Sequence, residues 1–355
     1  MNSPKSTNFV KVFEYPLIAS VFVCYTRGKS RGDYKIMNKK GNTIKWKTRT
    51  LDEITKNFLA KAKKRLKEST FSRYSFICER HILPYFKGVE LGKINTKMIN
   101  KFIEYKLKDG GLKGHALSPK TVNDIVCLLL QILRNYSKFN MDTIMNIEKP
   151  SYRPTEINIF TEAEYNRLKT YLSTGIDSKK LGIITAMLTG IRIGELCALK
   201  WGNIDLANRI IAIDKTIQRI KVANDTATKK TKIVIDTPKS SASIRKIPIP
   251  EILFDKLEEF KSSDNTYLLT NTQAYIEPRI YQRYFKSYIE ACNIKDNNFH
   301  TLRHTFATKA VEKETDTKTL SLLLGHADVS FTMKRYVHPN MEHKRAQIEK
   351  IASDF

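Results

Sequence analysis

A polar, proline-containing stretch near the middle of the chain constrains its fold most. It reads N-I-E-K-P-S-Y-R-P-T-E and contains Pro150 and Pro154. Proline disfavours helical conformation in the residue before it, and a polar run of this kind is typical of an extended connection. We therefore predict a linker at residues 146–158, with a separately folded domain on each side and a hinge between them.

The N-terminal side of this linker has the pattern of a small helical domain, residues 51–145. In residues 51–67, apolar side chains recur at helical spacing opposite a lysine-rich face. Three more helical segments are predicted at residues 70–86, 96–107 and 118–139. The last begins with Ser118 and a following proline, a favoured cap and first-turn pair.

Residues 1–50 differ from the helical segments that follow them. Short β-prone runs alternate there with the turn sequences R-G-K-S-R-G-D and K-K-G-N, and 11 basic residues stand against two acidic ones. We interpret this segment as a small basic β-rich unit. A disordered basic tail is the alternative.

The C-terminal side, residues 159–355, mixes helices and strands. Thr161 and Glu164 have the spacing of a capping box, which predicts the start of a helix. Alternating β-branched residues predict strands between Ile204 and Pro248, and a short amphipathic helix is expected after Met341. The predicted fold class is a multidomain, mainly α chain with α+β character, and 355 residues with 41% hydrophobic content suffice for two or three cores.

The charge of the chain points to a phosphate-rich partner. There are 62 Lys and Arg residues against 36 Asp and Glu, a formal net charge of +26. Residues 1–150 contain 30 basic and 12 acidic residues, whereas residues 151–355 contain 32 and 24. Coulombic attraction and counterion release favour nucleic acid as the partner. A lysine-rich surface that only maintains solubility is the alternative.

Other compartments and scaffolds fit the sequence poorly. The apolar run from Leu17 to Tyr25 is about half of a membrane span, and no small-residue cleavage site follows it. The five cysteines are scattered singly, without a C-x-x-C pair. We expect a reduced, cytoplasmic chain without a membrane span, a disulfide framework or structural zinc.

The C-terminal domain carries residue types suited to attack on a phosphodiester. The arginine fork can bind two phosphate oxygens at once. A tyrosine with a pKa near 10 is about one part in a thousand phenolate at neutral pH, so as a nucleophile it needs a base or a cationic field. The strings are L-T-G-I-R-I-G-E-L (188–196), H-T-L-R-H-T-F-A-T (300–308) and L-G-H-A-D-V-S-F-T-M-K-R-Y-V-H (324–338). With one lysine between them, they supply the candidate site residues Arg192, Lys239, His300, Arg303, His326 and Tyr336.

These strings, in this order, resemble the motifs of the tyrosine recombinases, or phage-integrase family, and the resemblance covers about residues 51–340. It implies a helical core-binding domain and a mixed α/β catalytic domain that close around duplex DNA. It further implies strand exchange through a 3′-phosphotyrosyl intermediate that frees a 5′-hydroxyl, without metal, ATP or other cofactor.

The resemblance also assigns roles to the site residues. Tyr336 is the nucleophile, His300 the general base and His326 a hydrogen-bond donor to the phosphate. Lys239, in T-P-K-S-S-A-S-I-R-K-I-P-I, matches the catalytic lysine of a β-hairpin, where it is the general acid. Arg192 and Arg303 clamp the non-bridging oxygens, and Glu195 is expected to orient the clamp.

The implied partners are double-stranded DNA attachment sites, a homotetramer on paired DNA sites, and accessory DNA-bending or excision factors. Residues 1–50 match an arm-type DNA-binding segment, which favours an integrase of a phage or conjugative element. The alternatives are a recombinase that resolves chromosome or plasmid dimers, a type IB topoisomerase and a catalytically silent DNA-binding regulator.

Four other residues are interpreted as packing, supporting or DNA-facing residues rather than catalytic ones. His304 stands four residues after His300, the spacing of a helical zinc pair, but without the glutamate or third ligand of such a site, and we assign it to packing. His338 is expected to support the helix of Tyr336. Tyr281 and Tyr284 are expected to be core or DNA-facing residues.

Overall fold

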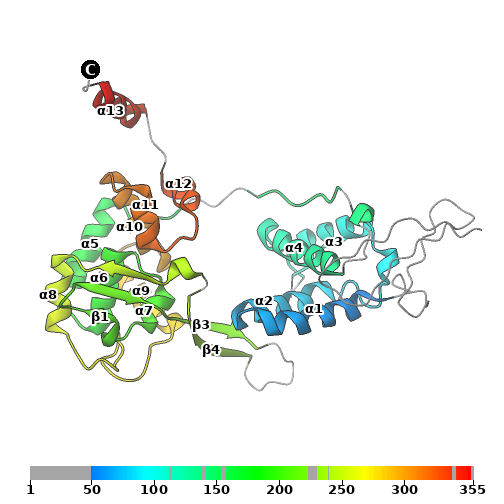
Figure 1. The fold of residues 1–355 in the computed structure, drawn as a ribbon, viewed down its shortest axis with the longest axis horizontal. Coiled ribbons are helices and arrows are strands. Elements are labelled where there is room, and N and C mark those ends of the chain that lie inside the picture. The colour runs from blue at the N-terminus through cyan, green and yellow to red at the C-terminus, as the bar shows by residue number, and fades with distance from the viewer. Residues whose placement is uncertain are drawn as a thin grey trace, which may run out of the picture. The chain divides into compact units, whose positions relative to one another are not determined.

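A computed structural model of the chain describes residues 49–111, 114–136, 141–144, 146–152, 157–222, 230–238, 240–337 and 341–352. The chain divides into two compact units, Met1–Arg153 and Pro154–Phe355 (Figure 1). The β-rich segment predicted at residues 1–50 lies, except for its last two residues, outside the described ranges. No helix among the described residues is long and apolar enough to cross a membrane.

The N-terminal unit is helical, as the apolar spacing predicts. Thr50 caps its first helix, and the lysine-rich end of that helix suits the negative end of the helix dipole. Ser118 caps its last helix and is followed by Pro119 in the first turn. The helices are α1 (Leu51–Arg65), α2 (Glu68–Ile77), α3 (Thr96–Lys108) and α4 (Pro119–Asn135), with short 3₁₀ turns at Leu91–Lys93 and Met141–Ile144.

Two of the predicted segments end earlier than expected. The segment predicted at 70–86 is α2 followed by one π-helical turn, Cys78–Ile82, and the segment predicted at 118–139 ends as a helix at Asn135. The reason for the first difference is tertiary, because Ile82 and Phe86 leave the helical register and are buried with Phe102 in the core of this unit.

In the C-terminal unit, helices pack around a second hydrophobic core. Thr161 caps α5 with the predicted capping box, because its hydroxyl accepts a hydrogen bond from the Glu164 backbone and the Glu164 carboxylate accepts one from the Thr161 backbone. The helices are α5 (Glu162–Ser173), α6 (Ser178–Thr189), α7 (Ile193–Ala198), α8 (Glu251–Glu259), α9 (Pro278–Ala291), α10 (His300–Glu312), α11 (Thr317–Leu324), α12 (Val329–Tyr336) and α13 (Met341–Ala352). Trp201, Tyr281 and Phe285 are among the largest side chains of this core, which confirms the core assignment of Tyr281.

Strands occur where the alternation predicts them, in two small antiparallel sheets. One has the order β1 (Ile204–Asp205), β2 (Ile210–Ile213) and β5 (Arg245–Pro248), and the other pairs β3 (Thr216–Lys221) with β4 (Thr231–Asp236). In the first sheet, Ile211 pairs with Ile247, and both side chains are buried. The return from β4 to β5 brings Arg245 to the edge of the candidate active site.

Candidate active site

The turn between α6 and α7 presents Arg192. Gly190 ends α6 with φ of +63°, and a Cβ atom there would lie 2.6 Å from the ring of Phe306. Only glycine fits both the left-handed backbone and this close approach. Two residues later, Arg192 precedes α7 and donates to Glu195 Oε1 (2.7 Å) and to the carbonyl of Gly325 (3.2 Å).

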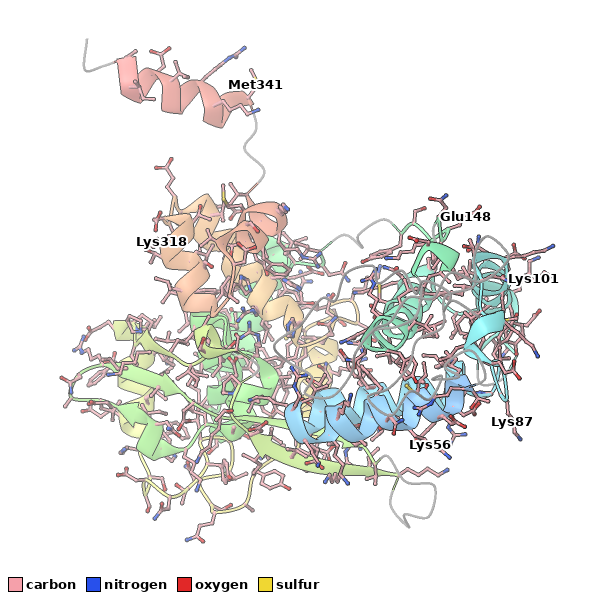
Figure 2. All side chains as sticks on the ribbon, turned by 45° about the vertical axis from the view of Figure 1, so that its right-hand side comes forward. Lys56, Lys87, Lys101, Glu148, Lys318 and Met341 are labelled. Carbon is pink, nitrogen blue, oxygen red and sulfur yellow. The ribbon has the colours of Figure 1, made fainter. Side chains whose placement is uncertain are left out.

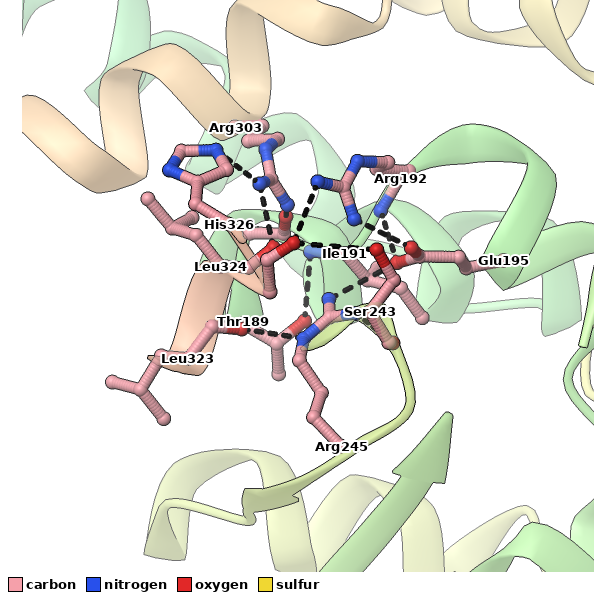
Figure 3. Close-up of polar contacts among 12 residues, drawn as sticks. Thr189, Ile191, Arg192, Glu195, Ser243, Arg245, Arg303, Leu323, Leu324 and His326 are labelled. Carbon is pink, nitrogen blue, oxygen red and sulfur yellow. Dashed lines mark hydrogen bonds and ion pairs between the residues drawn. The ribbon is translucent and has the colours of Figure 1, made fainter. Parts of the chain in front are cut away.

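Glu195 joins two arginines at the floor of the site (Figure 3). One carboxylate oxygen accepts from Arg192, and the other accepts from Arg245 Nη2 at 3.0 Å. The carboxylate is 3% exposed, and the side chain of Arg245 is 6% exposed. Burial by itself would raise the pKa of Glu195, but the charges and hydrogen bonds of Arg245 and Arg192 lower it, so the group stays ionised.

Arg245 ties strand β5 to the loop after α11. Its Nε donates to the carbonyl of Leu323 at 2.6 Å, and its Nη1 donates to the carbonyl of Ser243 at 3.1 Å. Each of the three guanidinium nitrogens of Arg245 therefore donates a hydrogen bond to the protein. These contacts make Arg245 a support for Glu195 and for the loop.

Arg303 occupies the centre of the site and is 3% exposed. It donates to the carbonyls of Gly190 (2.8 Å) and Leu324 (2.6 Å), and its Nη2 also contacts His326 Nε2 at 2.8 Å. Burial and the neighbouring charges of Arg192 and Arg245 lower the pKa of Arg303 to about 9. The site thus concentrates positive charge that an anion would relieve.

The partners of His326 define its tautomer. A guanidinium can only donate, so Nε2 of His326 accepts from Arg303, and Nδ1 must carry the hydrogen that it donates to Thr332 Oγ1 at 2.8 Å. Burial and the charges of Arg303 and Arg192 lower the pKa of His326 to about 4. In this state His326 has no free N–H for a phosphate, so the donor role expected from the sequence requires protonation of Nε2.

Tyr336 lies at the end of α12 and is 7% exposed. Its hydroxyl is 2.8 Å from Nδ1 of His304. The ring of His300, one turn earlier on α10, packs edge-on against the ring of His304, with centroids 5.7 Å apart. The contact between α10 and the tyrosine hydroxyl is therefore made by His304, and the interpretation of His304 as a packing residue alone was wrong.

His300 is exposed at the start of α10. Partial desolvation, together with the positive charges of Arg303 and Arg192, nevertheless lowers its pKa. Lys239 lies outside the described residues, between β4 and β5. Of the six residues chosen from the sequence, the structure links Arg192, Arg303 and His326 through the polar network, and places His300 and Tyr336 on either side of His304.

Two contributors were missed, and each had a signal in the sequence. Strand alternation puts Arg245 on the same face as the buried Ile247, so an arginine stands at an inward-facing position. His304 is one helical turn after His300, so it shares that face of the helix. The same spacing fits a helical metal pair, and because no further metal ligand accompanies it, the sequence favours packing for His304.

The N-terminal unit carries an exposed basic surface of its own. Lys56, Lys87 and Lys101 are exposed and project from this unit in Figure 2. Exposed lysines of this kind can contact phosphates without reading base sequence.

Comparison with known proteins gives consistent matches over both units. Residues 158–343 match the Phage integrase family, and residues 50–107 match the family described as Phage integrase, N-terminal SAM-like domain. The chain is 27% identical over 315 residues to a XerC-like tyrosine recombinase of Caldanaerobacter subterraneus subsp. tengcongensis, covering 80% of this chain and 78% of the relative.

A second relative and a solved structure also match most of the chain. The ICEBs1 integrase of Bacillus subtilis is 24% identical over 307 residues, covering 81% of this chain and 79% of the relative. The structure of the Tn1549 transposon integrase in complex with transposon right-end DNA is 20% identical, with a TM-score of 0.64. The match covers 86% of this chain and 100% of that chain. At that identity the structural likeness concerns the fold.

Proposed function

The chain belongs to the phage integrase family and is a tyrosine recombinase, an enzyme that cleaves and rejoins DNA, and we infer that Tyr336 is its nucleophile. The observation that carries this inference is the cluster of Arg192, Arg245 and Arg303 around a single buried carboxylate, on the same unit as the buried Tyr336 hydroxyl. Three guanidinium charges against Glu195 leave an excess of positive charge. A phosphodiester supplies the missing negative charge.

The proposed reaction begins when a DNA phosphate replaces water at Arg192 and Arg303. Both guanidinium groups are held by backbone carbonyls of Gly190, Leu324 and Gly325, so the donors are in place before the substrate binds. Preorganised donors of this kind stabilise the additional charge of the pentacoordinate transition state.

The covalent step is a transesterification. Oη of Tyr336 attacks phosphorus, the P–O5′ bond breaks, and a 3′-phosphotyrosyl bond and a 5′-hydroxyl result. The proton of the phenol passes to an imidazole of α10, and the departing oxygen takes a proton from Lys239, which the sequence alone assigns to this role. Attack of the 5′-hydroxyl of a partner strand reverses these steps and rejoins the DNA.

The proposed biological role is integration and excision of a mobile element at DNA attachment sites, by a homotetramer on paired sites. The likeness to the ICEBs1 integrase and to the Tn1549 transposon integrase supports this role. The likeness to a XerC-like recombinase supports the alternative of dimer resolution. A direct repeat in the DNA beside the gene distinguishes the two, because only an integrated element is flanked by its attachment sites.

Covalent capture on a nicked duplex with the core site tests the nucleophile. Tyr336→Phe removes only the hydroxyl, so we expect DNA binding close to that of the wild type and no adduct on a denaturing gel. Tyr284→Phe is the matched control, since Tyr284 is a half-exposed tyrosine of α9, and it should form the adduct normally. An adduct from Tyr336→Phe would refute the assignment, and relaxation of plasmids lacking a core site would indicate a topoisomerase instead.

A further inference from the structure

The nucleophile in this structure is bonded to a histidine outside the six residues chosen from the sequence. Tyr336 Oη lies 2.8 Å from His304 Nδ1, and the two rings are 5.8 Å apart with an interplanar angle of 45°. The phenol packs in a small apolar cluster with Ala307, Leu320 and Leu324. Within the described residues, His304 provides the hydrogen-bond partner of the hydroxyl.

The direction of this hydrogen bond follows from the surroundings. Burial lowers the pKa of His304 to about 4, with further contributions from His300, Arg335 and Arg303, so the ring is neutral at pH 7. Among the described residues, Nδ1 of His304 is the hydrogen-bond partner of the phenol, and we assign the phenol as the donor. Nδ1 of His304 therefore accepts the hydrogen of Tyr336, and Nε2 carries the ring hydrogen.

The charges around this pair act on both of its members. Burial raises the pKa of Tyr336, and the charges of Arg303, Arg335 and Arg192 oppose that rise. The same positive charges keep His304 from holding a proton. A phosphodiester bound to the arginines offsets these charges and raises the pKa of both groups. The imidazole then becomes a better proton acceptor, and the forming Oη–P bond makes the phenol proton more acidic.

We propose that His304 is a further catalytic residue, whose Nδ1 receives the proton of Tyr336 as the phenol oxygen attacks phosphorus. The Oη–P bond forms, the P–O5′ bond breaks, the phenol proton moves to Nδ1, and the 5′-oxygen is protonated by the acid on the opposite side. In rejoining, His304 returns the proton to the departing phenol. This inference rests on the proposed role of Tyr336.

The geometry separates His304 from its neighbour. His300 packs its ring against His304 rather than against the phenol. His300 is therefore assigned to the ring stack. The sequence predicts the general base at His300, whereas the proposal assigns it to His304, one helical turn later.

His304→Asn is the informative variant, because the amide can still accept a hydrogen bond near the position of Nδ1 but cannot take up a proton. We expect single-turnover cleavage of a nicked core-site duplex to fall by about 10²-fold at neutral pH. The rate of the variant should then rise steadily with pH, as hydroxide takes over the role of the base, whereas the wild type should level off. Lys309→Gln, a surface change on the same helix, is the control and should cleave normally.

Two substitutions of the reacting atoms distinguish proton transfer from positioning. Replacing Tyr336 by a fluorinated tyrosine gives a more acidic phenol, which should bring His304→Asn closer to the wild-type rate. A DNA substrate with sulfur at the bridging 5′ position has a better leaving group and should leave the deficit of His304→Asn unchanged.

Several results would overturn the proposal. Normal cleavage by His304→Asn would do so, as would a pH-independent deficit that the fluorinated tyrosine does not narrow, which indicates positioning only. If the fluorinated tyrosine reduced the rate deficit of His300→Asn and not that of His304→Asn, the general base would be His300. Binding to uncleavable duplex, measured in parallel, shows that each variant is folded. Adduct formation by Tyr336→Phe would refute the nucleophile itself, which is a separate failure.

Discussion

The three arginines of the site carry more positive charge than the one carboxylate beside them balances. Arg192, Arg245 and Arg303 share Glu195 as their acidic partner within the described part of the site. Several of their other donors bind backbone carbonyls, which orient the guanidinium groups without neutralising them. We expect a site built this way to bind phosphate, because the anion relieves the repulsion among the arginines.

Arg192→Lys should abolish most of the activity while keeping DNA affinity close to wild type. A lysine ammonium cannot donate to Glu195 and to the Gly325 carbonyl with the planar geometry of the guanidinium. We expect a loss of about 10²-fold or more in single-turnover cleavage. Arg209→Lys, at an exposed pair with Glu251, is the matched control. Equal rates for the two variants would contradict a role of the fork.

The two site histidines make the catalytic unit sensitive to acid. The pKa of both His304 and His326 is about 4 in the folded chain, below the ordinary value of 6.5. As the pH is lowered, the unfolded state therefore takes up protons at a higher pH than the folded state does. The free energy of unfolding falls as the pH drops from about 6.5 to about 4. After allowance for solvent screening, we expect a loss of about 1 kcal/mol per histidine.

Urea unfolding at several pH values, followed by the fluorescence of the buried Trp201 in a Trp46→Phe background, measures this loss. In His326→Gln the pH dependence should be weaker than in the parent. An unchanged dependence would show that His326 is not the group held neutral by the fold.

At the scale of secondary structure, the site is assembled from helix ends and the turns between them. Arg192 follows the left-handed end of α6, His326 follows the left-handed Gly325 at the end of α11, and Tyr336 ends α12. Carbonyls left unpaired at these helix ends accept hydrogen bonds from Arg303 and Arg192. The termini thus supply the groups that orient the arginines.

Gly190→Ala tests the close approach of two of these elements. The new Cβ would meet Phe306 at 2.6 Å and Leu324 at 3.0 Å, in addition to the backbone cost of the left-handed conformation. We expect a loss of about 2–4 kcal/mol in unfolding free energy and slower cleavage. Gly175→Ala has a similar φ but open space, so it should lose only about 1 kcal/mol and cleave normally. Equal effects would rule out the steric contribution.

Helix α13 presents an apolar stripe that includes Ile348 and Ile351, both more than 60% exposed. Such a short helix is marginally stable alone, and we propose that it packs onto a neighbouring protomer. Deletion of residues 346–355 should impair assembly of paired-site complexes in gel-shift assays and leave single-site binding near normal. Ile348→Asp should reproduce the defect, and Glu349→Gln on the same helix should not. Normal tetramers and recombination after the deletion would assign the tail to local packing.

At the scale of the whole molecule, charge is divided unevenly between the two units. The surplus of basic residues is concentrated in residues 1–150, and the catalytic unit is more balanced. Affinity for DNA is therefore expected to depend on the N-terminal part, whereas chemistry depends on the C-terminal part. This separation allows the two contributions to be measured independently.

Removal of residues 1–48 should reduce integration more than cleavage of the core site. Residues 1–48 carry 10 basic and two acidic residues, so their removal should also flatten the salt dependence of binding to the full attachment region, by roughly 0.9 log unit for each phosphate that the segment neutralises. Footprints of the full-length and truncated chains over that region test this. Identical footprints would mean that the segment binds no separate arm site.

The sequence by itself determined much of the secondary structure and most of the candidate site's residue types. Helical spacing, the capping pairs at Thr161 and Ser118, and strand alternation are local, so α1, α4, α5 and the strands could be predicted from neighbouring residues. The motifs around Arg192, His300 and Tyr336 likewise depend on short spacings.

Only the tertiary structure decided which groups meet. The link from Arg245 to Glu195 spans 50 positions, and the contact of His304 with Tyr336 spans 32. The tautomer of His326 depends on Arg303 and Thr332 together. Such contacts, and the pKa shifts that follow from them, arise from burial and from charges brought together by folding, which no local pattern encodes.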